Sequence, residues 1–319
     1  MLNRRSILTA ALSVAALPVA HLPALARAPV AGKQVAGIYR QKVGSIEVTC
    51  ILDGFVPLSA QVFTGAEPAE LKRILAASGL TEQLPTAVNA FVVNTGEKTY
   101  LIDSGTGSNT AFGPDLGRVQ ANLAAAGIKP ADIDAVILTH AHTDHVEGLI
   151  DSGGKALFPN AELVLHRDEH RFWLDDSSMN RMPEGVRFLF ASARKALAPY
   201  AKQTRLVTGG EIFPGVTFEP AVGHTPGHSV VRVNSGSEQM IFIGDIIHNS
   251  AIHTVRPDVG FAFDTDAAQA AASRKRIFDM IAADGLLVAG AHIAFPGVGR
   301  VLRDGPAFRY VPAEWRFGL

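Results

Sequence analysis

Apolar and polar residues alternate in the early part of the chain, which is the spacing of β-strands. Residues 35–63 read as strands, and the alternation over 45–52 leads into a turn at Asp53-Gly54. The spacing becomes helical over 67–78, and Gly79 is a suitable end for that helix. The pattern therefore predicts strands and then a helix before residue 80.

Two hairpins are predicted further along, over residues 90–102 and 229–243. Each consists of two apolar runs joined by a turn of the form Asn-x-Gly. Asp103 follows the first hairpin and Asp245 the second, each beside a small residue. This similarity indicates an internally duplicated sheet.

Two short continuous apolar runs, 135–139 and 286–289, predict strands that are buried on both faces. They lead to His140 and His292 respectively. No Ser/Gly-rich linker or charged tract divides the chain, so we expect one domain of the α/β class. Further helices are expected over 114–126 and 266–283.

Composition narrows the class of protein. Of the 319 residues, 47% are hydrophobic and 18% are charged, so the chain can bury a sizeable core and is not a low-complexity or disordered protein. The formal net charge is −1, which provides no bulk attraction for nucleic acid. Cys50 is the single cysteine, so an internal disulfide is excluded and we expect this thiol in the core.

The N-terminus has the three-part organisation of a bacterial export signal. Arg4 and Arg5 precede an alanine-rich apolar stretch, and Ala24-Leu25-Ala26 forms a small-x-small cleavage site. The paired arginines favour the twin-arginine route. We expect residues 1–26 to be a cleaved export signal and 27–319 to be a single periplasmic or secreted domain without a stable membrane anchor. An ordinary secretory signal and a retained anchor are the alternatives.

The strongest chemical signal is a stretch of six residues, His-Ala-His-Thr-Asp-His, that directly follows a predicted buried strand. In a continuous helix His140 and His142 would point apart, but on a loop they can converge. Neutral imidazoles and a carboxylate suit zinc and similar divalent metals. Burying these groups without a cation would be costly. The stretch therefore predicts a metal site built from His140, His142, Asp144 and His145.

Three more candidate ligands, His228, Asp245 and His292, lie where a predicted strand meets a loop. Sites on sheet scaffolds usually assemble at such positions. Each is weak evidence alone, but together with the first four residues they make seven ligands. Seven ligands fill two metal sites if one carboxylate bridges both ions.

The order and approximate spacing of these residues resemble the metallo-β-lactamase fold superfamily, and the resemblance extends over nearly all of residues 36–315. The motifs that carry it are the stretch at 140–145, Gly-His-Thr-Pro-Gly-His ending at His228, Gly-Asp245 and the late His292. Within the superfamily the chain resembles the methyl parathion hydrolase branch and the neighbouring acyl-homoserine lactonases. Local phrases that support this branch are Val93–Gly96, Phe112–Arg118, Phe158–Ala161, Phe172–Leu174 and Ala291–Gly297.

The resemblance implies a four-layer αββα sandwich with two divalent metal ions at one edge of its two sheets. Zinc is the first expectation, with Mn, Co or Fe as alternatives. His224 would be structural, and Asp103 would support the ligand loop from behind. One metal would be held by His140, His142 and His228, the other by Asp144, His145 and His292, and both by Asp245.

Such a centre implies a hydrolase, because two cations lower the pKa of a shared water and make hydroxide available near neutral pH. The hydroxide would attack a carbonyl or phosphorus centre, and a metal would stabilise the developing negative charge. Asp245 and Asp144 would be the catalytic carboxylates, the latter also as a proton acceptor. The Gly-x-Ser-x-Gly motif of serine hydrolases does not occur in the sequence.

Aromatic residues would form the mouth of the pocket, where they favour a small hydrophobic ester, lactone or neutral organophosphate. The resemblance places Phe112, Trp173, Phe188 and Phe190 there. His248 stands where methyl parathion hydrolase carries an apolar residue. If His248 enters the pocket, a lactone or ester carbonyl becomes the more natural ligand.

Two other functions stay open on the sequence. Glyoxalase II, persulfide dioxygenase and β-lactamase types share much of the ligand set, although Asp245 disfavours a β-lactamase. A non-catalytic periplasmic zinc-binding protein would bind metal without turnover.

The sequence has no cluster of Arg or Lys near the metal motifs that would clamp a phosphate group. The resemblance suggests that the protein forms a homodimer.

Overall fold

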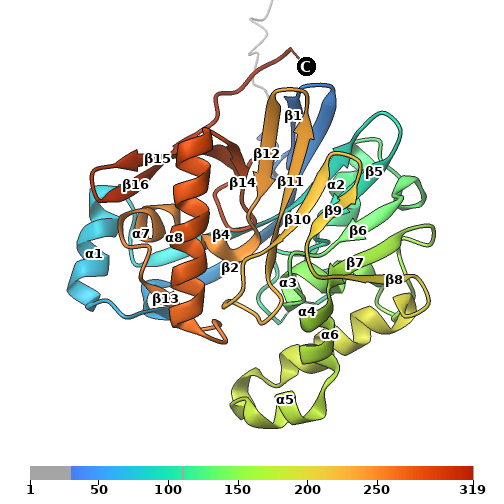
Figure 1. Ribbon diagram of the computed structural model, residues 1–319, viewed down its shortest axis with the longest axis horizontal. Coiled ribbons are helices and arrows are strands. Elements are labelled where there is room, and N and C mark those ends of the chain that lie inside the picture. The colour runs from blue at the N-terminus through green and yellow to red at the C-terminus, as the bar shows by residue number, and fades with distance from the viewer. Residues whose placement is uncertain (1–29, 110, 319) are drawn as a thin grey trace, which may run out of the picture. The chain divides into compact units, whose positions relative to one another are not determined.

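Two seven-stranded sheets form the centre of the protein in a computed structural model that describes residues 30–109 and 111–318 (Figure 1). The predicted export signal, residues 1–26, lies outside the described residues. Ala36–Leu319 form one compact unit. Among the described residues, no helix is both long enough and apolar enough to cross a membrane.

The first sheet is mixed: its strands are antiparallel from β1 to β5 and parallel from β5 to β8. In spatial order they are β1 (Ile38–Val43), β2 (Ile46–Ser59), β4 (Gln83–Asn94), β5 (Thr99–Ile102), β6 (Ala135–Ile137), β7 (Glu162–His166) and β8 (Thr204–Val207).

The second sheet is antiparallel except where β12 and β14 run parallel. Its strands are, in spatial order, β9 (Gly210–Phe213), β10 (Val216–Pro220), β11 (Ser229–Ser235), β12 (Glu238–Phe242), β14 (Leu287–Ala289), β15 (Val298–Asp304) and β16 (Ala307–Pro312). A separate two-stranded sheet pairs β3 (Phe63–Thr64) with β13 (Gly260–Phe261).

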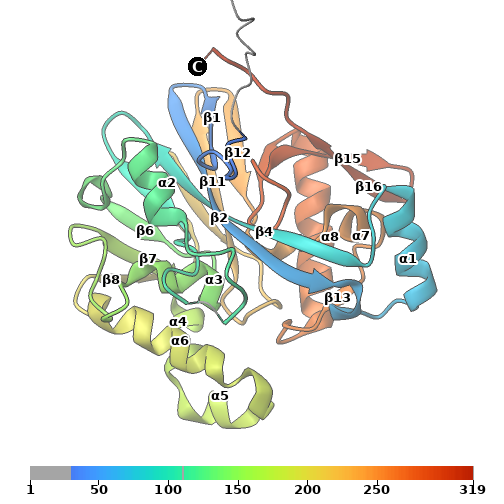
Figure 2. The same ribbon diagram turned by 180° about the vertical axis from the view of Figure 1, so that it is seen from behind.

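Helices cover the outer faces of both sheets. The helix α8 (Ala267–Asp284) comes forward in Figure 1 and α2 (Val119–Ala125) in Figure 2. The sheets meet through a buried apolar layer in which the rings of Phe91 and Phe242 lie 5.3 Å apart. Separate apolar clusters join each sheet to its helices. This arrangement confirms the predicted αββα sandwich. The helices are α1 (Pro68–Ala77), α2 (Val119–Ala125), α3 (Thr143–Val146), α4 (Arg167–Leu174), α5 (Asp176–Arg181), α6 (Phe188–Leu197), α7 (Ser250–Val255) and α8 (Ala267–Asp284).

The predicted duplication is visible in the topology. In the first sheet the β4–β5 hairpin is followed by β6, which runs parallel to β5. In the second sheet the β11–β12 hairpin is followed by β14, parallel to β12. Asp103 and Asp245 follow the two hairpins, and His140 and His292 follow the two parallel strands. The polar residues of the two sheets therefore follow the ends of equivalent strands.

The turn predicted at Asp53-Gly54 is wrong, because β2 runs through it with a bulge. A Cβ on Gly54 would lie 1.7 Å from the carbonyl oxygen of Asp115, so the glycine permits a close approach of backbones. The buried Asp53 carboxylate accepts hydrogen bonds from the amides of Gly117 and Val119. This anchored loop explains why the helix predicted over 114–126 begins only at Val119.

Candidate metal centre

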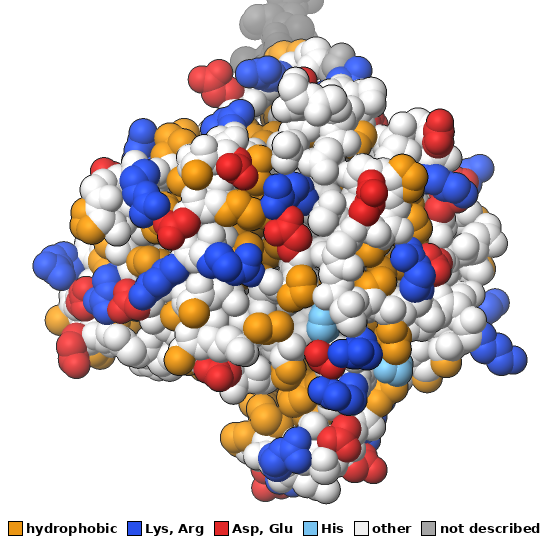
Figure 3. All heavy atoms as spheres, viewed as in Figure 1, with side chains coloured by type: hydrophobic (Ala, Val, Ile, Leu, Met, Phe, Trp, Pro, Cys, Tyr) orange, Lys and Arg blue, Asp and Glu red, His pale blue; other side chains and the backbone are white. Residues whose placement is uncertain are grey.

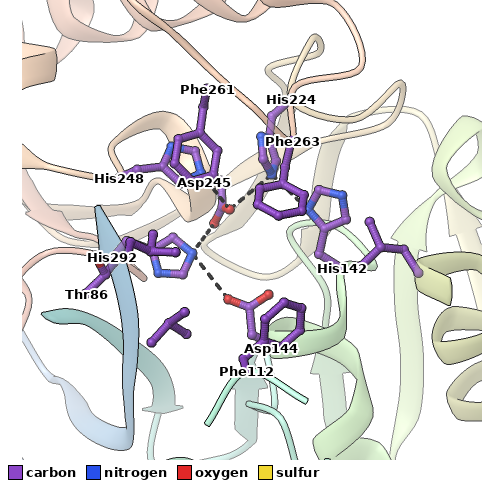
Figure 4. A pocket seen from close by; sticks show the side chains of 13 residues that line it. Thr86, Phe112, His142, Asp144, His224, Asp245, His248, Phe261, Phe263 and His292 are labelled. Carbon is purple, nitrogen blue, oxygen red and sulfur yellow. Dashed lines mark hydrogen bonds and ion pairs between the residues drawn. The ribbon is translucent and has the colours of Figure 1, made fainter. Parts of the chain in front are cut away.

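The polar cluster lies where loops leave both sheets, and its side chains point towards one another (Figure 4). His140 and His142 lie on the loop between β6 and α3, which confirms that they converge on a loop. Asp144 and His145 lie in the single turn of α3. The other members follow strands of the second sheet: His224 comes after β10, Asp245 after β12 and His292 after β14.

One group of ligand atoms belongs to His140, His142, His224 and Asp245. Nε2 of His140 lies 3.0 Å from Nδ1 of His142, which lies 2.9 Å from Nε2 of His224. Nε2 of His224 is 3.1 Å from Oδ2 of Asp245. Three ring nitrogens and a carboxylate oxygen therefore face one small volume.

A second group belongs to Asp144, His145 and His292. Oδ2 of Asp144 lies 3.5 Å from Nε2 of His145 and 3.4 Å from Nε2 of His292. The same two nitrogens lie 3.1 and 3.2 Å from Oδ1 of Asp245. Asp245 thus turns one oxygen towards each group, as a bridging ligand would.

The donor set fits divalent cations. Nε2 of His145 and Oδ1 of Asp245 are buried and form no hydrogen bond, and an unsatisfied buried polar atom is costly. Nδ1 of His142 faces the Nε2 atoms of two other rings, and neutral imidazoles placed in this way can each offer a lone pair to one cation. Imidazoles and carboxylates in this number suit zinc and related metals.

The pKa values in the cluster are set by burial and by the charges of neighbouring side chains. Burial lowers the pKa of His140 and His142, which leaves them neutral. Burial opposes ionisation of Asp245, but His292 and His145 outweigh it and hold the pKa of this carboxyl well below its usual range. Burial also opposes the charge on His224, yet Asp245 and Asp264 raise its pKa to about 9. In the absence of a metal, a proton on His224 supplies part of the positive charge that faces Asp245.

The prediction that His228 is a ligand is wrong in this geometry, and His224 stands in its place. Nε2 of His228 accepts a hydrogen bond of 3.0 Å from the amide of Asp245, and its Nδ1 lies 3.0 Å from the carbonyl oxygen of Ala221. Both ring nitrogens are therefore committed to backbone groups. Residue type cannot distinguish the two histidines of Gly-His-Thr-Pro-Gly-His, so the sequence held no signal for the correct choice.

Each ligand histidine of the second group is oriented through its other ring nitrogen. Nδ1 of His145 lies 2.8 Å from Oδ2 of Asp103, and Nδ1 of His292 lies 2.9 Å from the carbonyl oxygen of Ala87. Asp103 also accepts hydrogen bonds from the amide and hydroxyl of Thr139. Asp103 therefore lies behind the ligand loop, where the sequence analysis placed it. Asp264 orients His224 in a similar way, because its Oδ1 lies 2.8 Å from Nδ1 of that ring. The sequence did not predict this role of Asp264.

A cavity of about 80 Å³ opens beside the cluster. Of the predicted pocket residues, Phe112 and His248 line it, and Nε2 of His248 lies 3.1 Å from Oδ2 of Asp245. Sequence reasoning missed Phe261, whose ring stacks on that of His248 at 3.7 Å. The remaining lining comes from Val56, Leu58, Thr86, His142, Asp144, Leu189, His224, Asp245, Phe263 and His292.

The other three aromatic residues do not line this cavity. Trp173 and Phe190 are buried and pack against each other, with ring centroids 4.7 Å apart. Phe188 is 43% exposed, and its ring lies 6.0 Å from that of the lining residue Phe112, so its place at the pocket mouth stays a prediction. The predictions for Trp173 and Phe190 were wrong because α4 and α6 turn these side chains into the helix–sheet core.

The surface carries charges of both signs. Figure 3 shows basic and acidic side chains interspersed over the face seen in Figure 1, with no continuous basic patch on that face.

Comparison with known proteins identifies the family. Residues 84–292 match the metallo-β-lactamase superfamily, and the chain belongs to it. In sequence, a probable metallo-hydrolase of Mycobacterium tuberculosis is 27% identical over 184 residues, which are 50% of this chain and 57% of that protein. The chain thus spans less than two thirds of the length of that relative.

Two solved structures are similar over most of the chain. The hydrolase AbOPH of the β-lactamase superfamily is 32% identical, with a TM-score of 0.84, over 89% of this chain and 100% of that one. AidC, a dizinc quorum-quenching lactonase in complex with the product N-hexanoyl-L-homoserine, is 29% identical, with a TM-score of 0.82, over 88% and 99%. The chain is therefore a member of this superfamily, and a hydrolase and a lactonase are among its structural relatives.

Proposed function

We propose that this protein hydrolyses lactones or aryl esters with the help of two divalent cations, of which zinc is the first expectation. The observation that carries the proposal is the position of Asp245, whose two oxygens face two separate groups of ligands at the edge of an apolar cavity. One ion would be held by His140, His142 and His224, and the other by Asp144, His145 and His292.

When bound, the cations supply a water molecule of lowered pKa and stabilise negative charge on the substrate oxygen. Asp245 holds the two ligand groups together through one carboxylate. Asp144 lies at the cavity with 17% of its side chain exposed. It is thus the carboxylate that can accept a proton near the scissile bond. His140 and His142 stay neutral through burial, which suits ligands.

The cavity supports an uncharged substrate. Phe112, Phe261 and Phe263 form apolar walls, which take up an acyl or aryl group and exclude water. His248 adds a polar group within this wall, which can contact the carbonyl oxygen of a lactone or ester. Likeness to AidC, described with an acyl-homoserine product, points the same way. Phosphotriester hydrolysis is a secondary activity in this proposal.

A substrate panel tests the proposal. Initial rates of the metal-loaded chain are measured on dihydrocoumarin, an acyl-homoserine lactone, methyl parathion and a chromogenic cephalosporin. We expect the highest kcat/KM on a lactone or aryl ester. A dominant rate on methyl parathion would make this protein a phosphotriesterase, and a dominant rate on the cephalosporin would make it a β-lactamase. Bound metal without any turnover would support a zinc-binding protein.

We also propose export to the periplasm by the twin-arginine route. The support is the N-terminal sequence, in which Arg4 and Arg5 precede an apolar stretch and a cleavage site at Ala24-Leu25-Ala26. Export of a folded chain would allow the metal centre to be loaded before transport. The homodimer suggested by the family resemblance stays a prediction.

A further inference from the structure

We propose that Glu169 is a positioning residue that holds the two ligand loops of the first metal group together and so sets the affinity of that group for its cation. The inference rests on the proposed metal binding at His140, His142 and His224. Glu169 touches none of these side chains. Glu169 instead accepts hydrogen bonds from backbone and side-chain groups that neighbour these histidines.

Glu169 lies in α4 and is fully buried. Its Oε1 accepts hydrogen bonds from the amide of Ala141, at 2.9 Å, and from the indole of Trp173, at 2.6 Å. Its Oε2 accepts from the hydroxyl of Thr225, at 2.6 Å, and from the amide of Gly227, at 2.9 Å. All four partners are donors, and two carboxylate oxygens provide the acceptor sites that such a set requires.

Three of these donors lie on loops that follow strands of the two sheets, and the fourth, Trp173, lies in α4. Ala141 stands between His140 and His142 on the loop after β6, whereas Thr225 directly follows His224 on the loop after β10. A single carboxylate therefore fixes the distance between two loops that must present ligands to one ion. The indole that it binds also packs edge-on against the ring of His142, with centroids 5.4 Å apart.

The loop after β10 packs very closely against Glu169. A Cβ on Gly227 would lie 2.3 Å from the amide nitrogen of Glu169. Only a glycine therefore permits the loop to come this close to α4. The glycine and the threonine of Gly-His-Thr-Pro-Gly-His both serve this contact. The motif thus provides a ligand, His224, and two of the groups that position it.

Substitution of Glu169→Gln in the full-length chain tests the proposal. The amide keeps the volume of the side chain, but its NH₂ must face two of the four donors whichever way it turns. The matched control is Glu162→Gln, because Glu162 lies on β7 of the same sheet and pairs with Arg205 at 3.0 Å on the surface. Both variants are titrated with Co²⁺ against a chelator, and the visible absorbance of the bound metal is recorded.

We expect two dissociation constants in the wild type and the control. In Glu169→Gln one of them should rise by about 10–100-fold, the range seen for groups that orient metal ligands, while the other stays unchanged. His292→Ala, which removes a ligand of the second group, should weaken the other ion and so identifies which constant belongs to which group. The Co²⁺ spectrum should change only for the weakened site.

Two results would overturn the proposal. One is a folded Glu169→Gln with both dissociation constants unchanged, and the other is an equal loss at both sites, which is the effect of general destabilisation. If Glu169→Gln does not fold, Thr225→Val decides alone, since it removes one donor at constant shape; an unchanged affinity would then refute the proposal. Metal binding is measured without substrate, so the result stands even if the protein hydrolyses no lactone.

Discussion

The carboxylate of Asp103 lies 2.8 Å from Nδ1 of His145 and accepts two further hydrogen bonds from Thr139. The end of the first hairpin is thereby tied to the start of the ligand loop. The ring of His145 cannot rotate without breaking this contact, so its Nε2 stays aimed at the metal group. Asp103 does not line the cavity, but it sets the orientation of the ligand His145.

Replacement of this carboxylate tests the relationship. Asp103→Asn presents an amide NH₂ to at least one of its donors and frees the ring of His145 to turn. We expect a loss of about 10–100-fold in metal affinity with the fold retained. The measurement is zinc content at buffered free zinc. Asp279→Asn is the control, because Asp279 is 56% exposed and pairs with Arg303 on the surface. Equal zinc content in both variants would refute the role.

Substitution of the two histidines of Gly-His-Thr-Pro-Gly-His should separate ligand from support. His224→Ala removes a ring nitrogen that faces the cluster, so we expect loss of one metal ion. His228→Ala leaves the amide of Asp245 and the carbonyl of Ala221 without partners, which costs about 1–3 kcal/mol each in stability. We expect His228→Ala to unfold at lower urea concentration yet to bind two ions. The opposite pattern of metal content would restore His228 as the ligand.

Metal affinity should rise with pH up to about pH 9. In the metal-free protein the pKa of His224 is raised to about 9, so this ring is protonated at neutral pH. A metal ligand must be neutral, and binding therefore releases that proton. Below pH 9 each released proton is worth about tenfold in affinity per unit of pH. His145 and His292 add to this dependence, because Asp245 outweighs their burial and raises the pKa of both rings. Zinc affinity at pH 6.5 and pH 8 checks this, and an affinity independent of pH would contradict it.

Export should depend on the paired arginines. The double substitution Arg4→Lys and Arg5→Lys keeps the charge but removes the guanidinium pair of the twin-arginine signal. We expect the variant to accumulate inside the cell, as assayed by fractionation. Undiminished arrival in the periplasm would favour an ordinary secretory signal instead.

The sequence was most informative where local pattern and chemistry coincide. The apolar run before His140 predicts a strand, which is found, and the dense polar residues after it converge as a metal loop requires. The hairpins before Asp103 and Asp245 are also found, because Asn-x-Gly turns act locally. The superfamily and its sandwich followed from the order of these motifs.

The errors arise where tertiary contacts decide. Gly54 looked like part of a turn, but it accommodates the backbone of Asp115, more than 50 residues away in the sequence. His224 and His228 are equal as residue types, and only the packing of Asp245 distinguishes them. Glu169 stands in no recognisable motif, since its role depends on four donors from separate segments.

A zinc titration followed by lactone hydrolysis tests the central claim most directly. The metal-free full-length chain is mixed with increasing zinc, and the rate on dihydrocoumarin is recorded at each step. Because Asp245 faces two ligand groups, we expect the rate to rise and to reach its plateau at two equivalents of zinc. Full activity without metal, or a plateau at one equivalent, would contradict a binuclear hydrolase.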